Sequence, residues 1–283
     1  MKDFRLRTAS PARKLFIIIS LMIMVLYVVL ILYPLFNMVM SSFRSTREII
    51  GKPFALPKTF DFSIYKTVWV EKHFSRYFIN SLLVTICAMV FVLVFGSMAA
   101  FGISRYKYKI NTIVYMLFLS GIMLPLKASI IPLFMIIKNL GLMDKPLAII
   151  LIFIAIGIPS TVFILSGFMK GIPVDLEYAA RIDGCNDFGI FLRVILPICV
   201  PAIALVTIYN SVPIWNDFFF PLVFIQSDKY KTLPVGLSTF IGQHDTNWSL
   251  MFTGLAISIG PMIFIYLFMS KYFIKGMTAG AVK

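Results

Sequence analysis

The sequence has few charged residues and few of the side chains that bind metals. Of its 283 residues only 13% are charged, whereas soluble domains carry roughly a quarter. The two histidines, His73 and His244, stand alone and belong to no cluster with metal-ligand spacing, so we expect no metal site. No GxxxxGK[ST] loop is present to hold phosphates, and we therefore expect the chain itself neither to bind nor to hydrolyse ATP.

Cysteine is equally scarce. Cys87, Cys185 and Cys199 are an odd number, lack CxxC spacing, and at least two of them fall in or beside apolar segments. We therefore expect no disulfide framework.

Long apolar runs are what the sequence has in abundance, because 60% of its residues are hydrophobic. A bilayer core about 30 Å thick requires about 20 apolar residues per helix, and such runs follow one another along the chain. We predict an all-α, polytopic bundle of six transmembrane helices, forming a single transmembrane domain over 1–283. The predicted spans are 15–38, 78–103, 112–135, 147–168, 198–223 and 251–271.

Proline and glycine interrupt several of these spans. Pro125 and Lys127 make the third span the weakest, and Pro159, Pro213, Pro221 and Gly260-Pro261 predict kinks, which bundled membrane helices tolerate.

Positive charge predicts the orientation of the bundle. The net charge of +14 could suggest nucleic acid, but the basic residues lie in short loops between apolar runs, so anionic lipid headgroups explain it better. Basic residues cluster before the first span and in the 104–111 loop, which favours both termini in the cytoplasm. They are Lys2, Arg5, Arg7, Arg13 and Lys14, then Arg105, Lys107 and Lys109. Segments 39–77, 136–146 and 224–250 would then lie outside.

The opening residues also resemble a signal peptide. The apolar run from Leu15 to about Phe36 is longer than a signal-peptide core, and no small-x-small cleavage site follows. We expect this run to remain as the first membrane helix.

The loop 169–197, between the fourth and fifth spans, has a polar pattern of its own. Asp175 is a good N-cap, the next eight residues favour a helix, and Gly184 suits the left-handed residue that ends one. Another helix is expected to start near Asn186. A face shared by Leu176, Ala179, Ala180 and Asp183 would be flat enough to enter a cleft in another protein. The alternative is a solvated connector whose helix is incidental.

The stretch from Leu176 to Gly184, with Ile195-Leu196-Pro197 downstream, resembles the EAA signature of ATP-binding-cassette (ABC) importer permeases. Tyr178 occupies the position of the signature's glutamate, and Glu177 stands one residue earlier, about 100° around the helix. Other stretches are similar to the carbohydrate-uptake, MalG-like, binding-protein-dependent branch of these permeases. They are Asn80–Leu82, Ala99–Arg105, Leu140–Leu142, Trp215–Phe218, Thr232–Leu237 and Lys275–Lys283.

The resemblance implies a set of partners and contacts. The short helix would be a coupling helix that docks on a cytoplasmic ATPase, and the C-terminal tail would also contact that subunit. The coupling residues would be Glu177, Tyr178, Ala179, Ala180, Asp183 and Gly184, and the tail residues Gly276, Thr278, Gly280 and Lys283. The partners would be a second permease forming a heterodimer, two ATP-binding cassette subunits that carry ATP and Mg, and an extracellular sugar-binding protein. The place would be a bacterial cell membrane, and this chain would bind no cofactor itself.

Trp215, Asn216 and Asp217 form a polar group inside the otherwise apolar fifth span. An ionisable side chain is costly in a membrane and needs a protein or water partner, so these residues are candidates for the translocation pathway. The alternative is a buried, hydrogen-bonded group that locks helix packing.

The function that we expect is a permease subunit of an ATP-driven importer for carbohydrate, and the resemblance favours an oligosaccharide. The alternative is a secondary transporter of a small polar solute that is driven by an ion gradient through Asp217. A membrane-embedded enzyme is disfavoured, because the spans contain no metal ligands and no nucleophile–base pair.

Overall fold

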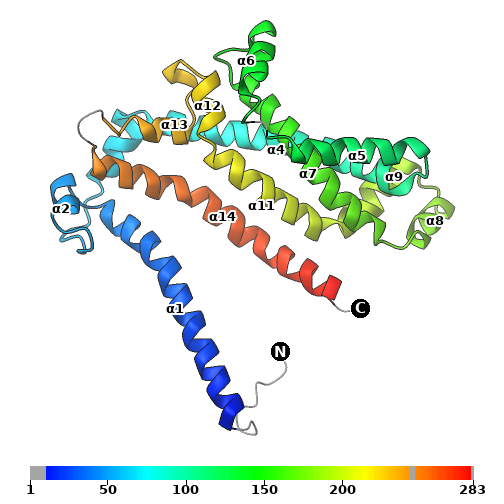
Figure 1. Cartoon of the computed structure of the whole chain (residues 1–283), viewed down its shortest axis with the longest axis horizontal. Helices are drawn as coiled ribbons and strands as arrows, with labels where there is room; N and C mark the ends of the chain where they lie inside the picture. Colours follow the sequence, from blue (N-terminus) through cyan, green and yellow to red (C-terminus); the bar gives the residue numbers. More distant parts are fainter. Residues whose placement is uncertain (1–10, 126, 243–245, 282–283) are drawn as a thin grey trace. The chain divides into compact units, whose positions relative to one another are not determined.

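The computed structural model describes residues 11–125, 127–242 and 246–281, without the side chains of residues 11 and 272–281 (Figure 1). The chain divides into two compact units, 1–68 with 240–257 and 69–239 with 258–283. Over the described residues the elements are helical, and the one β-type pairing there is an isolated bridge between Ile241 and Thr246.

The first unit begins with α1 (Pro11–Ser41), an apolar helix whose side chains from Leu15 to Phe36 are largely exposed. It continues with α2 (Thr46–Gly51), which starts in a capping box formed by Ser45 and Glu48, and with α3 (Ser63–Lys66). The unit also includes the first residues of α14 (Trp248–Ala281). Ser249 donates from its hydroxyl to the carbonyl oxygen of Arg44 at 2.6 Å, which ties the start of α14 to the turn before α2.

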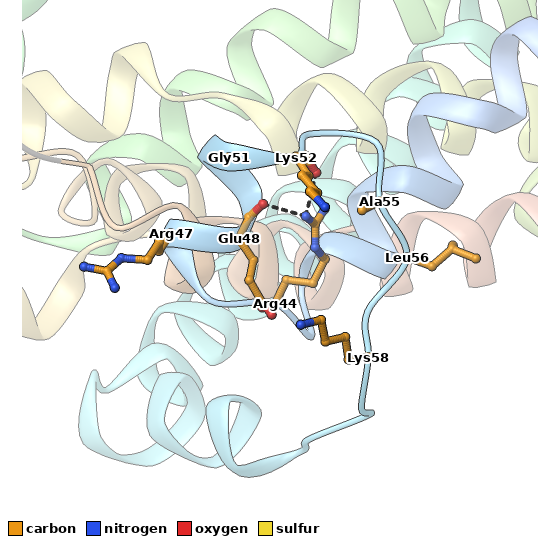
Figure 2. A pocket seen from close by; sticks show the side chains of 8 residues that line it. All are labelled: Arg44, Arg47, Glu48, Gly51, Lys52, Ala55, Leu56 and Lys58. Carbon is orange, nitrogen blue, oxygen red and sulfur yellow. Dashed lines mark hydrogen bonds between the residues drawn. The ribbon is translucent and has the colours of Figure 1, made fainter.

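Arg44 organises the chain around α2. Its side chain is buried, and Nη2 donates to the carbonyl oxygens of Glu48 and Lys52, both at 2.6 Å (Figure 2). The surrounding pocket of about 290 Å³ is also lined by Arg47 and Lys58. Because the Arg44 guanidinium donates its hydrogen bonds to backbone carbonyls, we assign it a structural role in stabilising this turn.

The second unit is built around two long helices that pack along each other, α4 (Phe74–Arg105) and α7 (Pro146–Lys170) (Figure 1). They approach closely at Gly96, where an added Cβ would lie 2.4 Å from Thr161 Cγ2. The π-helical turn η2 (Thr67–Glu71) leads into this unit. Its other elements are α5 (Lys109–Met123), α6 (Ile130–Asn139), α8 (Asp175–Ile182), α9 (Asp187–Ile190), the π-helical turn η3 (Phe191–Ile195), α10 (Leu196–Ile198), α11 (Val200–Asn216), α12 (Phe219–Phe224), the 3-10 turn η4 (Asp228–Tyr230) and α13 (Leu233–Ser238).

The predicted spans are matched unevenly. In the described part of the chain, α1, α4, α7 and α14 are long and apolar enough to cross a membrane, and residues 187–216 form a further candidate that is bent by 77°. The third predicted span is two short helices, α5 and α6, with a break between Met123 and Ile130. Pro125, which has no amide hydrogen to donate, lies in that break. An all-helical membrane protein is therefore what the structure supports, and six spans with both termini inside remain a prediction.

Proline has different effects at different positions. Pro159, Pro213 and Pro261 lie inside continuous helices, in α7, α11 and α14. The fifth predicted span is instead interrupted at Asp217 and resumes as α12, so its break precedes Pro221.

Candidate functional site

The predicted coupling helix is α8, an eight-residue helix that ends as the sequence predicted. Gly184 has a φ of +82°. Its amide donates to the carbonyl oxygen of Arg181 at 3.0 Å, and the amide of Cys185 donates to the carbonyl oxygen of Ala180 at 2.9 Å. These bonds are the Schellman arrangement, which requires a left-handed residue at Gly184. The start differs from the prediction, because Asp175 is the first helical residue and no side chain caps the helix.

The outward face of α8 is not the predicted one. Ala180 is only 8% exposed and packs in a cluster with Met169, Ile172 and Ile190. The exposed face carries Tyr178, Ala179 and Ile182, and Ile182 is 88% exposed. The prediction that both alanines form one outward face was wrong, because consecutive helical residues point about 100° apart.

Glu177 also differs from its predicted role as a surface contact. Its side chain is buried on the inner side of α8, and its Oε1 lies 2.6 Å from Nε of Arg105, the last residue of α4. The two side chains are 8% and 6% exposed. In this structure Glu177 therefore faces its own chain.

A second contact joins the end of α4 to the same loop. The hydroxyl of Tyr106 donates to Oδ2 of Asp187 at 2.7 Å, and Oδ1 of Asp187 pairs with Arg181 at 2.5 Å. Asn186 caps α9 by accepting from the amide of Gly189 at 2.8 Å, which confirms the helix predicted near Asn186. The loop is thus held to α4 by two consecutive residues.

A cavity of about 620 Å³ with a partly polar lining lies among the helices of the second unit. Lys127 and Asp217 lie on its wall, with Nζ and Oδ2 3.6 Å apart, and each stands where a helix is interrupted. The other polar lining residues are Ser160, Tyr209 and Asn210. A mostly apolar wall with a few polar groups is the usual composition of a small-molecule site.

Of the three predicted pathway residues, only Asp217 lines this cavity. Trp215 is 3% exposed, donates from Nε1 to the carbonyl of Ser258 at 3.0 Å and packs edge-on against Phe78. Asn216 faces outward and donates to the carbonyl of Val212 at 2.9 Å. The packing alternative therefore describes Trp215 within this chain. Neither residue lines this cavity, because both leave α11 in other directions than Asp217, and their place on the translocation pathway stays a prediction.

Asn210 is the residue that sequence reasoning missed. Its Oδ1 accepts from the Ser160 hydroxyl at 3.1 Å, and its Nδ2 donates to Thr161 Oγ1 at 3.3 Å and to the carbonyl of Val206 at 3.1 Å. The signal was available, because a lone amide inside the apolar run of the fifth span needs polar partners as much as Asp217 does.

The predicted tail contacts remain untested. Gly276, Thr278 and Gly280 belong to α14 by their backbone, but their side chains lie outside the described set. Lys283 lies outside the described residues altogether.

Comparison with known proteins decides the family. Residues 92–279, more than half of the chain, match the family described as the binding-protein-dependent transport system inner membrane component. The chain belongs to this family. It is therefore a membrane permease subunit rather than an enzyme, and ATP hydrolysis belongs to a separate subunit.

Relatives of this permease match over most of their length. It is 36% identical over 258 residues to a probable ABC transporter permease protein, YurM, of Bacillus subtilis, covering 91% of this chain and 86% of the relative. It is 34% identical over 278 residues to the arabinooligosaccharides transport system permease protein AraQ of the same organism, covering 97% and 98%. A crystal structure of a bacterial ABC transporter involved in alginate import has a chain with the same fold, with a TM-score of 0.80, 24% identity, and coverage of 94% of this chain and 99% of that chain.

Proposed function

We propose that this permease is one half of the membrane channel of an ABC importer for an oligosaccharide. The similarity to AraQ carries the substrate class, because it extends over 97% of this chain and 98% of a relative named for arabinooligosaccharides. The other half would be a second, related permease, and an extracellular sugar-binding protein would deliver the substrate.

We place six spans in the membrane, with both termini in the cytoplasm. In this arrangement α5 and α6 together form the third span, and α11 with α12 forms the fifth. The break in each is compatible with a membrane because irregular backbone is tolerated there where it lines a cavity. Lys127 and Asp217, one in each interruption, line the same cavity.

We assign the substrate path to this cavity. Its volume of about 620 Å³ is within the range of sites for drug-sized ligands. The groups of Ser160, Tyr209 and Asp217 are donors and acceptors that match sugar hydroxyls. Apolar side chains, among them Phe153 and Phe220, supply the remaining wall.

We assign docking on the ATPase to the outward face of α8. Tyr178, Ala179 and Ile182 are exposed together, and an exposed isoleucine beside a tyrosine is typical of a surface that another protein covers. Closure of the ATPase dimer would displace α8, and the bundle would switch between outward-open and inward-open states.

The experiment is transport by the reconstituted complex. The permease is purified with its partners, placed in proteoliposomes with ATP inside, and supplied with the binding protein and a labelled arabino-oligosaccharide. Uptake that requires ATP and persists with an ionophore supports the proposal. Uptake that needs no ATPase and collapses with the ionophore would instead identify a secondary transporter driven through Asp217.

A further inference from the structure

We infer that Arg105 and Tyr106, at the end of α4, are positioning residues that transmit the movement of α8 into the membrane bundle through Glu177 and Asp187. This inference rests on the proposed docking of α8 on an ATPase. It concerns the inner side of that helix, where Glu177 and Ala180 are buried against the rest of this chain.

The helix α8 is too short to hold its own position. It has eight residues, and helices shorter than about 12 residues are marginal in water without tertiary contacts. A push on its outward face reaches the bundle through Arg181, which pairs with Asp187, and through the residues buried on its inner face. Those residues are Glu177 and Ala180. Ala180 contributes only the packing of a methyl group, so the ion pair of Glu177 with Arg105 is the stronger contact between α8 and the bundle.

The connection between Glu177 and Arg105 is a buried ion pair. Glu177 Oε1 and Arg105 Nε are 2.6 Å apart and almost fully buried, although they are not aligned as a hydrogen bond. Buried opposite charges attract strongly because little water screens them, and separating them would leave two uncompensated charges. Arg105 Nη1 also donates to the carbonyl of Ile172 at 3.2 Å, so one guanidinium holds both α8 and the segment that leads to it.

A second attachment to the end of α4 restrains rotation of α8. A single contact would let α8 pivot about Arg105. Tyr106, the next residue, holds Asp187 at the start of α9, and Asp187 in turn pairs with Arg181 on α8. Two attachments on successive helices fix the direction in which α8 can move α4. Since α4 packs along α7, the displacement reaches the helices that line the cavity.

A purely structural role is the competing explanation, and transport efficiency separates the two. A structural pair would reduce the amount of assembled complex but leave unchanged the sugar moved per ATP hydrolysed. A transmitting pair would leave ATP hydrolysis running while transport falls. The readout is therefore the ratio of ATP hydrolysed to sugar transported, measured on purified complex in proteoliposomes.

The test compares Glu177→Gln, Arg105→Gln and the double variant Arg105→Glu with Glu177→Arg. The matched control is Lys231→Gln, which removes one partner of the more exposed Lys231–Asp228 ion pair elsewhere in the unit. We expect each single variant to raise the ratio at least about fivefold, the lower end of typical coupling between sites. We expect the exchanged pair to recover most of this loss and the control to match wild type.

Single variants with a wild-type ratio would overturn the inference. If the single variants do not assemble, Tyr106→Phe decides, because it removes one hydroxyl and keeps the ring. A raised ratio in Tyr106→Phe supports the inference and an unchanged ratio overturns it. Failure of the proposed function looks different, since the wild-type complex itself would then show no ATP-dependent uptake.

Discussion

Lys127 and Asp217 face each other from two interrupted helices, with Nζ and Oδ2 3.6 Å apart. Asp217 has a second task, because its Oδ1 accepts from the amide of Phe220 at 2.8 Å in the first turn of α12. Its partner is more weakly held, since the Lys127 side chain is 65% exposed and that of Asp217 11%. The Asp217 carboxylate therefore both stabilises the first turn of α12 and lines the cavity, whereas the Lys127 ammonium mainly lines the cavity.

Asp217→Ala should thus lower both stability and uptake. We expect a loss of about 0.5–2 kcal/mol in the free energy of unfolding, the usual cost of removing a cap. Lys127→Gln is the control and should cost no more than about 1 kcal/mol, as for an exposed ion pair. Thermal unfolding in detergent measures the first effect and proteoliposome uptake the second. Equal destabilisation by both variants would contradict the view that only Asp217 stabilises the backbone of α12.

Gly184→Ala should destabilise the end of α8 although space is available for the added methyl group. No atom lies within 4 Å of a Cβ built at Gly184, so the cost comes from the φ of +82° alone and should be about 1–2 kcal/mol. Gly167→Ala is the matched control, because its Cβ also meets nothing within 4 Å and its φ is not positive. Within α7 that change should be neutral or stabilising by about 0.5–1 kcal/mol. Chemical denaturation of both variants makes the comparison.

Gly96→Ala should destabilise for the opposite reason, by overpacking. The new Cβ would lie 2.4 Å from Thr161 Cγ2, and we expect a cost of about 1–3 kcal/mol. Adding Thr161→Ser removes that methyl carbon, keeps the hydroxyl, and should recover part of the loss. Gly102→Ala, on the same helix with no atom within 4 Å, is the control. Full additivity of Gly96→Ala and Thr161→Ser would rule out a direct clash.

Ile182→Arg should reduce binding of the ATPase without unfolding the permease. Ile182 is 88% exposed, so the change in unfolding free energy should stay within about 0.5 kcal/mol, as at other surface positions. Phe54→Arg is the control, an equally conspicuous apolar residue that is 72% exposed in the predicted outer segment. Co-purification of the ATPase with each tagged variant is the measurement. If Ile182→Arg co-purifies as much ATPase as wild type does, the ATPase does not dock on this face.

Asp144→Asn should lower the melting temperature most at neutral pH. The amide of Ser227 holds the pKa of Asp144 below its ordinary value of 3.8, assisted by the amide of Gln226 and the hydroxyl of Ser227. A depressed pKa means that the ionised form is favoured in the folded state. Its stabilisation is present above pH 3.8 and is lost as the pH falls through the lower, folded-state value. The difference in melting temperature between wild type and variant should therefore shrink below pH 3.8, and a constant difference would contradict this account.

Local chemistry made much of this protein predictable. The length of the apolar runs indicated a membrane protein because lipid requires it, and Gly184 ended α8 because few other residues adopt a positive φ cheaply. The polar run from Leu176 to Gly184 was enough to locate the loop and the family, which the match over residues 92–279 then confirmed.

Tertiary structure alone decided which way the side chains point. Glu177 and Ala180 face inward because Arg105, distant in sequence, and the apolar cluster with Met169, Ile172 and Ile190 lie against this side of α8. Trp215, Asn216 and Asp217 are consecutive, yet only Asp217 reaches the cavity, because the helix ends at Asn216 and the next residues turn away. A pattern of residues along one helix determines which of them share a face, but only the contacts made by the rest of the chain determine which face is covered.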